Sequence, residues 1–481
     1  MIKWILIACA VLMIALPGRP QSFDAFIAYL NSLPEGQRMA VVDSFMIATA
    51  PYGFPYITTD TARFIYRGPS STVQVAGDFN GWNPASAFLQ KVSGTDFFYV
   101  SRKFEMNARL DYKFVLDGSN WILDPLNPGT CSGGYGPNSE LAMPGYVQPW
   151  EIETYPGTMM GTVVTDQIFS NYVNKTFQLK VYLPAEYDPQ LSIRYPVVYF
   201  QDGYEYISLG YTDKVLDNLI DSAVCCPLIG VFVRPNNRNE EYAGNLREEY
   251  QSFFAGELVP YIDEKYLTLN QASARAVIGD SYGGNISALI SYHYPELFGK
   301  CGLHSAAFQP NGYEAYNLIT QGEVKPIQWV SVWGTYEGLW QNMRDFRDFL
   351  QGHGYNLLWQ ELPEGHSWGL WRATIDVMLP FFFPPAFLDT GENLQPSGNI
   401  IKAFPNPAKQ ELNLTLTLPE PALARIHLYA LSGQLVFDET AGIPSGNQVM
   451  HLDTGRYCPG MYLLYIQAEN WSHSEKIAIL Q

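Results

Sequence analysis

One serine lies in the pattern G-x-S-x-G, a short turn that can present a hydroxyl group as a nucleophile. The motif is Gly279-Asp280-Ser281-Tyr282-Gly283. In a chain with 40 Gly this pattern arises by chance often enough to be weak alone. Its setting strengthens it, because the apolar run Ala274–Ile278 leads in and a helical pattern beginning at Asn285 leads out. A strand, a sharp turn and a helix are what such a serine requires, so Ser281 is the candidate nucleophile for attack on a carbonyl.

A serine hydroxyl needs a base to take its proton, and the base needs an acid to orient it. Of the seven His in the chain, His366 lies in a loop directly after the last predicted strand, downstream of Ser281. Glu337 follows the preceding predicted strand, which ends at Trp333. We therefore expect His366 as the base and Glu337 as the orienting acid. A solvated, helix-capping carboxylate is the alternative for Glu337, and its rival Asp345 falls inside a predicted helix.

The negative oxygen formed during attack on a carbonyl needs hydrogen-bond donors, which backbone N–H groups can supply. One is expected at Tyr282, the residue after the candidate nucleophile. The other is expected at Tyr204, in a tight turn that follows the apolar run Val197–Phe200. Asp202, in the same turn, is interpreted as a turn residue rather than a catalytic one.

Residues 149–385 must position these groups, and in this stretch apolar strand-like runs alternate with helical patterns. Buried strands separated by helices predict a mostly parallel sheet with helices on both faces. The predicted strands are Gln178–Leu183, Tyr195–Phe200, Leu228–Val233, Ala274–Ile278, Lys300–Ser305, Ile327–Val332 and Asn356–Leu362. The clearest predicted helices are Glu248–Tyr266, Asn285–His293 and Leu339–Gly352.

The segments that flank residues 149–385 have different sequence patterns. Residues 22–55 hold two amphipathic helical patterns, Phe23–Leu33 and Gln37–Ala48. Residues 56–148 hold short strands separated by turn signals, which predicts a small β-sandwich. Residues 386–399 predict a linker, and residues 400–481 return to short alternating strands, a second small β-sandwich. The predicted fold class is multidomain: a mostly parallel α/β domain flanked by two β-sandwich domains.

Residues from about 160 to 383 resemble the esterase D-like family of α/β-hydrolases, which includes enterochelin, feruloyl and acetyl-xylan esterases. The stretches that carry the resemblance are Val198–Gly203, Phe253–Ile262, the serine turn with its double glycine, Gly334–Glu337 and Gly365–Trp368. The resemblance implies an α/β-hydrolase fold and hydrolysis of a carboxylic ester by Ser281, His366 and Glu337. The family often has Asp at the acid position or lacks an effective acid, and its substrates vary widely.

Residues 56–148 resemble the early-set β-sandwich found before glycogen-active enzymes and before many esterases of this type. The motifs that carry the resemblance are Val75–Pro84, Tyr112–Gly118 and Trp121–Pro125. Flat aromatic faces can stack on sugar rings, so Trp82 or Trp121 could contact carbohydrate. The alternative is that both fill the sandwich core or its contact with the central domain.

Both ends of the sequence predict export. Lys3 and the apolar run Trp4–Leu16 predict a secretory signal peptide over residues 1–21, because a membrane span needs about 20 apolar residues. Leu6–Cys9 superficially matches a lipoprotein cleavage site, but cleavage there would leave a hydrophobic region of only about five residues. No second long apolar run is present, so no membrane span is predicted.

Residues 400–481 resemble the sorting domain of type IX secretion. The motifs that carry the resemblance are Phe404–Pro407, Leu431–Gln434, Gly460–Leu464 and Glu475–Leu480. The resemblance implies secretion machinery as a partner and export across the inner and outer membranes, to the cell surface or the medium. An extra sugar-binding sandwich is the alternative.

Composition argues against several other classes. The net charge of −18, without a basic patch, excludes nucleic acid as an expected partner. The cysteines beyond the predicted signal are odd in number and lack C-x-x-C spacing, so they support neither a disulfide framework nor a zinc site. They are Cys131, Cys225, Cys226, Cys301 and Cys458. We interpret them as small buried apolar residues and predict no metal and no cofactor.

The sequence therefore predicts a secreted serine esterase that removes feruloyl or acetyl groups from polysaccharide, with a carbohydrate-linked ester as substrate. A siderophore-type ester, as in enterochelin esterases, is the alternative within the same class. A surface carbohydrate-binding protein without turnover is the alternative from a different class, and the complete set of Ser, Glu and His argues against it.

Overall fold

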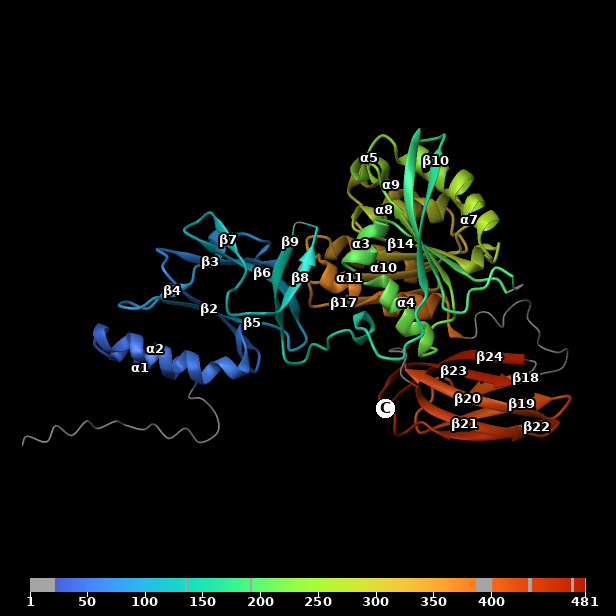
Figure 1. Ribbon diagram of the computed structural model, residues 1–481. Coiled ribbons are helices and arrows are strands. Elements are labelled where there is room, and N and C mark those ends of the chain that lie inside the picture. The colour runs from blue at the N-terminus through green and yellow to red at the C-terminus, as the bar shows by residue number, and fades with distance from the viewer. Residues whose placement is uncertain are drawn as a thin grey trace, which may run out of the picture.

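The computed structural model describes residues 22–134, 136–190, 193–385, 400–430, 435–468 and 471–480. The predicted signal peptide (residues 1–21) and the predicted linker (residues 386–399) lie outside the described residues. Figure 1 shows helices and short strands in blue and cyan, a large α/β body in green to orange, and a group of strands in red.

Strands β1 to β9 form two antiparallel sheets, together called the N-terminal β module (residues 56–142). One sheet has the order β1-β2-β5-β4, and the other has the order β3-β6-β9-β8 with β7 paired to β6. Side chains from both sheets share one apolar cluster, which includes Phe64, Phe98 and Tyr112. The strands are β1 (Tyr56–Thr58), β2 (Thr61–Arg67), β3 (Val73–Gly77), β4 (Gln90–Lys91), β5 (Phe97–Lys103), β6 (Arg109–Leu116), β7 (Asn120–Ile122), β8 (Thr130–Gly133) and β9 (Gly136–Ala142).

Helices α1 (Phe23–Ser32) and α2 (Glu35–Thr49) lie close to the predicted positions and cover the outer face of the first sheet. Successive strand residues point to opposite faces, so Phe64 enters the module core while Ile65 meets the helices. The amphipathic pattern of this segment is therefore explained by docking on the module.

The central domain holds an eight-stranded sheet in the order β10-β11-β13-β12-β14-β15-β16-β17. The strands from β13 to β17 in this order are parallel, which confirms the predicted mostly parallel sheet, and β10 and β11 form an antiparallel edge. Strand β10, whose side chains are largely exposed, was not predicted from the sequence. The strands are β10 (Thr162–Ser170), β11 (Lys175–Leu183), β12 (Val197–Phe200), β13 (Ile229–Arg234), β14 (Arg275–Asp280), β15 (Lys300–His304), β16 (Gln328–Gly334) and β17 (Leu357–Leu362).

Helices cover both faces of this sheet, as predicted. In β12, Val197 and Tyr199 point to one apolar cluster, while Val198 and Phe200 point to the other. The first face is covered by α6 (Arg247–Phe253), α7 (Val259–Lys265), α8 (Tyr282–His293), α9 (Pro310–Gln321) and α10 (Trp340–Gly352). The second face is covered by α3 (Gly203–Ser208), α4 (Thr212–Asp221), α11 (Trp368–Arg372) and α12 (Ile375–Phe382).

The helix predicted as Glu248–Tyr266 is present as α6, a π-helical turn (Phe254–Leu258) and α7 in succession. A short helix, α5 (Arg238–Tyr242), follows β13 and was not predicted. Among the described residues, no helix is long and apolar enough to cross a membrane. Four of the cysteines are buried as expected, whereas Cys458 is exposed.

The last described residues form two antiparallel sheets with a common apolar cluster. Their orders are β18-β19-β22 and β21-β20-β23-β24. The strands are β18 (Ile400–Phe404), β19 (Glu411–Leu418), β20 (Ala422–Ala430), β21 (Leu435–Ile443), β22 (Gly446–Asp453), β23 (Gly460–Ala468) and β24 (Trp471–Ile479).

The N-terminal β module meets the central domain at a contact that buries several charged groups. Glu364, in the loop after β17, is 2% exposed. Burial raises the pKa of Glu364 to about 8, the positive charge of Arg109 opposes this rise, and the carboxylates of Asp111, Glu140 and Asp78 add to it. Glu364 therefore holds a proton in the folded protein at neutral pH.

Replacing Glu364 tests this assignment. The unfolded chain releases the proton near pH 4.5 and the folded protein near pH 8, so unfolding releases a proton between these values. The free energy of unfolding must fall as pH rises through this window. In Glu364→Gln this pH-dependent loss is absent. At pH 8 we therefore expect the free energy of unfolding of the variant to exceed that of the parent by about 1 kcal/mol or more, with a smaller difference near about pH 5.5. Thermal unfolding at both pH values measures the effect. If the free energy of unfolding falls equally in both proteins between the two pH values, the assignment is contradicted.

Candidate active site

Four loops leave the carboxyl ends of parallel strands at one end of the central sheet. Across the sheet the strands run β12, β14, β15, β16 and β17. Asp202 follows β12, Ser281 follows β14, Glu337 follows β16 and His366 follows β17. Ligand sites in open α/β sheets lie at this end, so the topology gathers the residues singled out by the sequence.

The backbone at Ser281 is strained, with φ of 52° and ψ of −117°. Few non-glycine residues adopt such a conformation, which is kept only where surrounding contacts enforce it. Here the Ser281 N–H donates to the carbonyl of His304 at 2.9 Å. A Cβ on Gly279 would lie 2.2 Å from the Gly283 carbonyl oxygen, so only glycine permits this close turn. The predicted strand, sharp turn and helix are present as β14, Ser281 and α8.

His366 and Glu337 lie in direct contact. The His366 Nδ1 is 2.6 Å from Glu337 Oε2, and the Glu337 side chain is 0% exposed while that of His366 is 34% exposed. The second oxygen, Glu337 Oε1, accepts from the Gly334 N–H at 3.3 Å. Burial excludes the solvated capping carboxylate considered as the alternative. A proton on Nδ1 shared with the carboxylate leaves Nε2 as the nitrogen that can act as a base.

The rival carboxylate, Asp345, lies within α10 as expected, where it accepts from the Gln341 side chain at 2.8 Å. The structure thus pairs the histidine with Glu337.

The two candidate oxyanion donors lie in the first turns of α8 and α3. Tyr282 is the first residue of α8 and Tyr204 is the second residue of α3, where backbone N–H groups lack partners within the helix. A Cβ on Gly283 would lie 3.1 Å from Asp202 Oδ2, so the two turns adjoin. The Tyr204 ring has cations near it, Lys180 Nζ at 4.7 Å and the Arg234 guanidinium at 5.4 Å from its centre.

A cluster of two buried carboxylates and a partly exposed arginine beside the serine turn was not predicted from the sequence. Arg238 Nε donates to both carboxylate oxygens of Asp202 at 2.8 Å, and Nη2 donates to the Asp280 carbonyl at 3.2 Å. Burial, and then the Asp202 charge, raise the pKa of Asp280 well above its usual range. Asp202 is a turn residue as predicted, with φ of 52°, and it also ties the loop after β12 to β14 through Arg238. Arg238 is distant in sequence and no motif marks it.

His304 is buried next to the serine turn without being a base for it. Its Nδ1 is 2.8 Å from the Tyr206 hydroxyl and its Nε2 is 3.1 Å from the Thr374 hydroxyl. Burial lowers the pKa of His304 to about 3, so the ring is neutral. Both ring nitrogens are occupied by these hydroxyl groups, so His304 has a structural role.

Trp82 and Trp121 lie side by side on the N-terminal β module. Their rings are 6.5 Å apart with an interplanar angle of 25°, and Trp121 is 44% exposed. Trp82 is anchored by its Nε1, which donates to Asp78 Oδ1 at 3.0 Å. Trp121 therefore does not fill the module core. Within the described ranges, no group of three or more His, Cys, Asp or Glu could hold a metal ion.

Two parts of the chain match known families. Residues 170–361 match the family described as "Putative esterase", and residues 402–480 match the family described as "Secretion system C-terminal sorting domain". The uncharacterized protein YjcH of Bacillus subtilis is 28% identical over 231 residues, which cover 45% of this chain and 95% of that protein. The endo-1,4-beta-xylanase/feruloyl esterase of Xylanibacter ruminicola is 31% identical over 157 residues, which cover 30% of this chain and 22% of that protein.

A solved structure extends the likeness to the fold. The ferric enterobactin esterase of Salmonella typhimurium has a TM-score of 0.59 at 19% identity, covering 69% of this chain and 95% of that one. Because the identity is low, the likeness concerns the fold alone. Residues 170–361 match the esterase family, and the chain is a carboxylic ester hydrolase that its type IX sorting domain directs to the cell surface or beyond.

Proposed function

We propose that the chain is a serine esterase in which Ser281, His366 and Glu337 form the catalytic triad. The proposal rests on the contact of 2.6 Å between the His366 imidazole and the buried Glu337 carboxylate. This pair lies at the carboxyl ends of the parallel strands, as does the strained turn that carries Ser281. A histidine oriented by a buried carboxylate is the arrangement that activates a serine hydroxyl.

Each group has one task in the proposed reaction. Ser281 Oγ attacks the ester carbonyl while His366 Nε2 takes its proton, and Glu337 stabilises the imidazolium that forms. The N–H groups of Tyr282 and Tyr204 donate to the oxyanion of the tetrahedral intermediate. His366 then protonates the leaving alcohol, and a water activated by the same imidazole releases the acyl group from Ser281.

The proposed substrate is a polysaccharide that carries feruloyl or acetyl esters. Three observations support this choice: the similarity to a xylanase/feruloyl esterase, the export signal, and the exposed tryptophan on the N-terminal β module. The second candidate is a siderophore-type ester, favoured by the fold shared with an enterobactin esterase. A surface carbohydrate-binding protein without turnover, the alternative from a different class, would show no hydrolysis in an activity assay.

The flanking parts belong to the same proposal. We propose that residues 56–148 and 400–481 are β-sandwich domains, the first an early-set module before the esterase domain of residues 149–385. In each, two antiparallel sheets enclose one apolar cluster. We also propose residues 1–21 as a signal peptide and residues 386–399 as a linker that separates the esterase from its sorting domain.

Substitution of the nucleophile is the direct test of the triad. Ser281→Ala is expected to lower kcat/KM on p-nitrophenyl acetate and methyl ferulate by about ten-thousand-fold or more, because the triad acts as a unit. His366→Ala should cost a similar factor. His353→Ala is the matched control, since His353 is the C-cap of α10 and its Nδ1–H donates to the Phe349 carbonyl at 2.8 Å.

Undiminished hydrolysis by Ser281→Ala would contradict the triad, and an inactive parent protein would favour the binding protein. A panel of acetylated xylan, feruloylated arabinoxylan and enterobactin then ranks the two substrate classes by kcat/KM. Faster turnover of enterobactin would overturn the polysaccharide assignment while leaving the triad intact.

A pull-down on xylan or glycogen tests the tryptophan pair. If Trp121 stacks on a sugar ring, Trp121→Ala should weaken retention by about five- to tenfold, since a base or sugar stacked on an aromatic ring contributes about 1 kcal/mol or more. Trp150→Ala is the matched control, because Trp150 is 42% exposed but is not part of the pair with Trp82. Equal retention of all three proteins would show that the pair does not bind sugar.

A further inference from the structure

The loop that carries His366 leaves an edge strand. β17 is the last strand of the central sheet and has β16 on one side only. The imidazole must nevertheless turn back toward Glu337, which follows β16. A loop at a sheet edge has fewer neighbours to fix it than a loop at the centre, so other contacts must define its path.

The N-terminal β module supplies backbone contacts to this loop. The Arg109 N–H, at the start of β6, donates to the Pro363 carbonyl at 3.2 Å, and Arg109 and Glu364 form an isolated parallel bridge. The carboxylate of Asp78 lies against Gly365, where a Cβ would come within 2.1 Å of its Cγ. The residues directly before His366 thus pack against the module as well as against their own domain, where the Tyr336 N–H donates to the Glu364 carbonyl at 2.9 Å.

A side-chain contact holds the residue directly after His366. Arg109 Nη1 donates to Ser367 Oγ at 3.1 Å. Ser367 occupies the N-cap of α11, where a serine side chain ordinarily accepts from the helix backbone, yet it makes no such bond. Its hydroxyl is committed to the N-terminal β module instead. A Cβ on Gly369 would lie 2.0 Å from Arg109 Cζ, so α11 also approaches the guanidinium closely.

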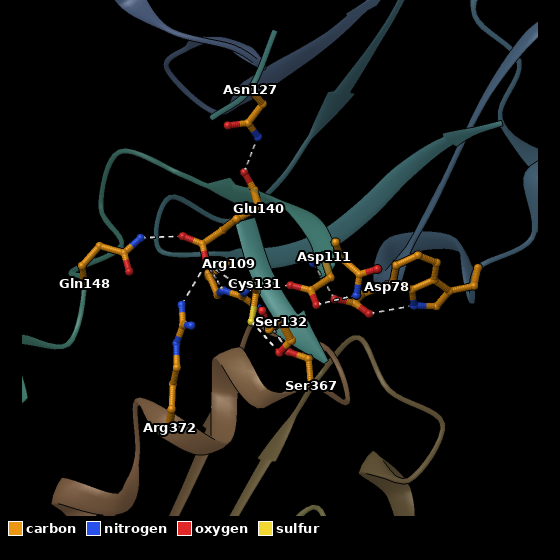
Figure 2. A network of polar contacts seen from close by, with 12 residues as sticks. Asp78, Arg109, Asp111, Asn127, Cys131, Ser132, Glu140, Gln148, Ser367 and Arg372 are labelled. Carbon is orange, nitrogen blue, oxygen red and sulfur yellow. Dashed lines mark hydrogen bonds and ion pairs between the residues drawn. The ribbon is translucent and has the colours of Figure 1, made fainter. Parts of the chain in front are cut away.

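Arg109 is itself rigidly placed. Its side chain is 0% exposed and pairs with Asp111 at 2.7 Å and with Glu140 at 2.8 Å. Glu140 is also reached from the central domain by Arg372 at 3.3 Å. Figure 2 shows Arg109 between the strands of the module and the helix that bears Arg372, with Ser367 at the start of that helix. A buried, doubly paired guanidinium has one available geometry, so it can define the position of a neighbour.

We propose that Arg109 is a positioning residue for catalysis: through Ser367 it fixes the loop that holds His366 against Glu337, so the N-terminal β module completes the active site. This inference rests on the proposed function of His366 as the base. Arg109 touches neither the substrate nor the reacting atoms. Its effect is on the orientation of the imidazole, which a displacement of about 1 Å would spoil at a cost of about a hundredfold in rate.

Ser367→Ala is the test variant, because it removes the hydroxyl that Arg109 binds and leaves Arg109 paired with Asp111 and Glu140. We expect kcat on p-nitrophenyl acetate to fall by about ten- to a hundredfold with KM changed by less than about threefold. The rate at which a fluorophosphonate inactivates Ser281 should fall by a similar factor, since it reports activation of the serine without substrate binding. Ser367→Thr keeps the hydroxyl and should recover most of the rate.

Two further variants separate positioning from general stability. Arg109→Lys keeps a positive charge but loses the planar fork, so it should show the same loss of kcat as Ser367→Ala. Arg67→Gln is the control, because Arg67 pairs with Asp96 at 2.6 Å in the same module on a face away from the histidine loop. It should change the melting temperature of the module and leave kcat unchanged.

The outcomes distinguish this inference from the proposed function. If Ser281→Ala is inactive while Ser367→Ala keeps the parent's kcat and fluorophosphonate rate, the triad stands and the positioning role is wrong. If Ser367→Ala and Ser367→Thr lose activity equally, or if kcat falls only where the protein unfolds, Ser367 is a packing residue and the inference is likewise overturned. Activity that survives in Ser281→Ala defeats both.

Discussion

The contact between His366 and Glu337 depends on a loop that must bend back from the edge of the sheet. Ser281 follows the central strand β14, whose neighbours on both sides fix its turn, but His366 follows β17, which has a neighbour on one side only. An imidazole works as a base only when its orientation is held closely, because proton transfer requires a short and well-aligned contact. The carboxylate of Glu337 holds one nitrogen, and the N-terminal β module packs against the loop from the other side.

Two arginines fix the two halves of the site, the fully buried Arg109 and Arg238, whose side chain is 34% exposed. Arg238 binds Asp202 and the carbonyl of Asp280, and so joins the loop after β12 to the strand that ends at Ser281. Arg109 binds Asp111, Glu140 and Ser367, and so joins the module to the histidine loop. Removing one partner of a fully buried ion pair, such as that between Arg109 and Asp111, costs about 3–5 kcal/mol of unfolding free energy. Each arginine therefore commits neighbouring backbone to one arrangement.

The N-terminal β module connects its exposed surface to this site through Asp78. One oxygen of this carboxylate accepts from the Trp82 ring and the other accepts from the Asp111 N–H at 2.7 Å, while the group as a whole packs on Gly365. A sugar bound at the tryptophan pair would thus sit on the same rigid unit that supports the histidine loop. The last two sheets share an apolar cluster of their own and contribute no residue to the site described here, which fits a role in export.

The gathering of Ser281, Glu337 and His366 at one end of the sheet could be predicted from the sequence. Each lies directly after a predicted strand, and parallel strands bring their carboxyl ends together. The parallel sheet and the helices on both faces followed from uniformly apolar runs separated by helical patterns, which are local properties of the chain. The exposed strand β10, the Arg238 cluster and the contact of Arg109 with Ser367 could not be predicted. Arg109 and Ser367 are 258 positions apart, and Arg109 belongs to no motif, so only the docking of two folded units brings them together. The candidate site residues could be predicted from short motifs in the sequence, whereas the buried charges that hold those motifs in place depended on tertiary structure, because residues far apart in the chain meet only when the folded units dock.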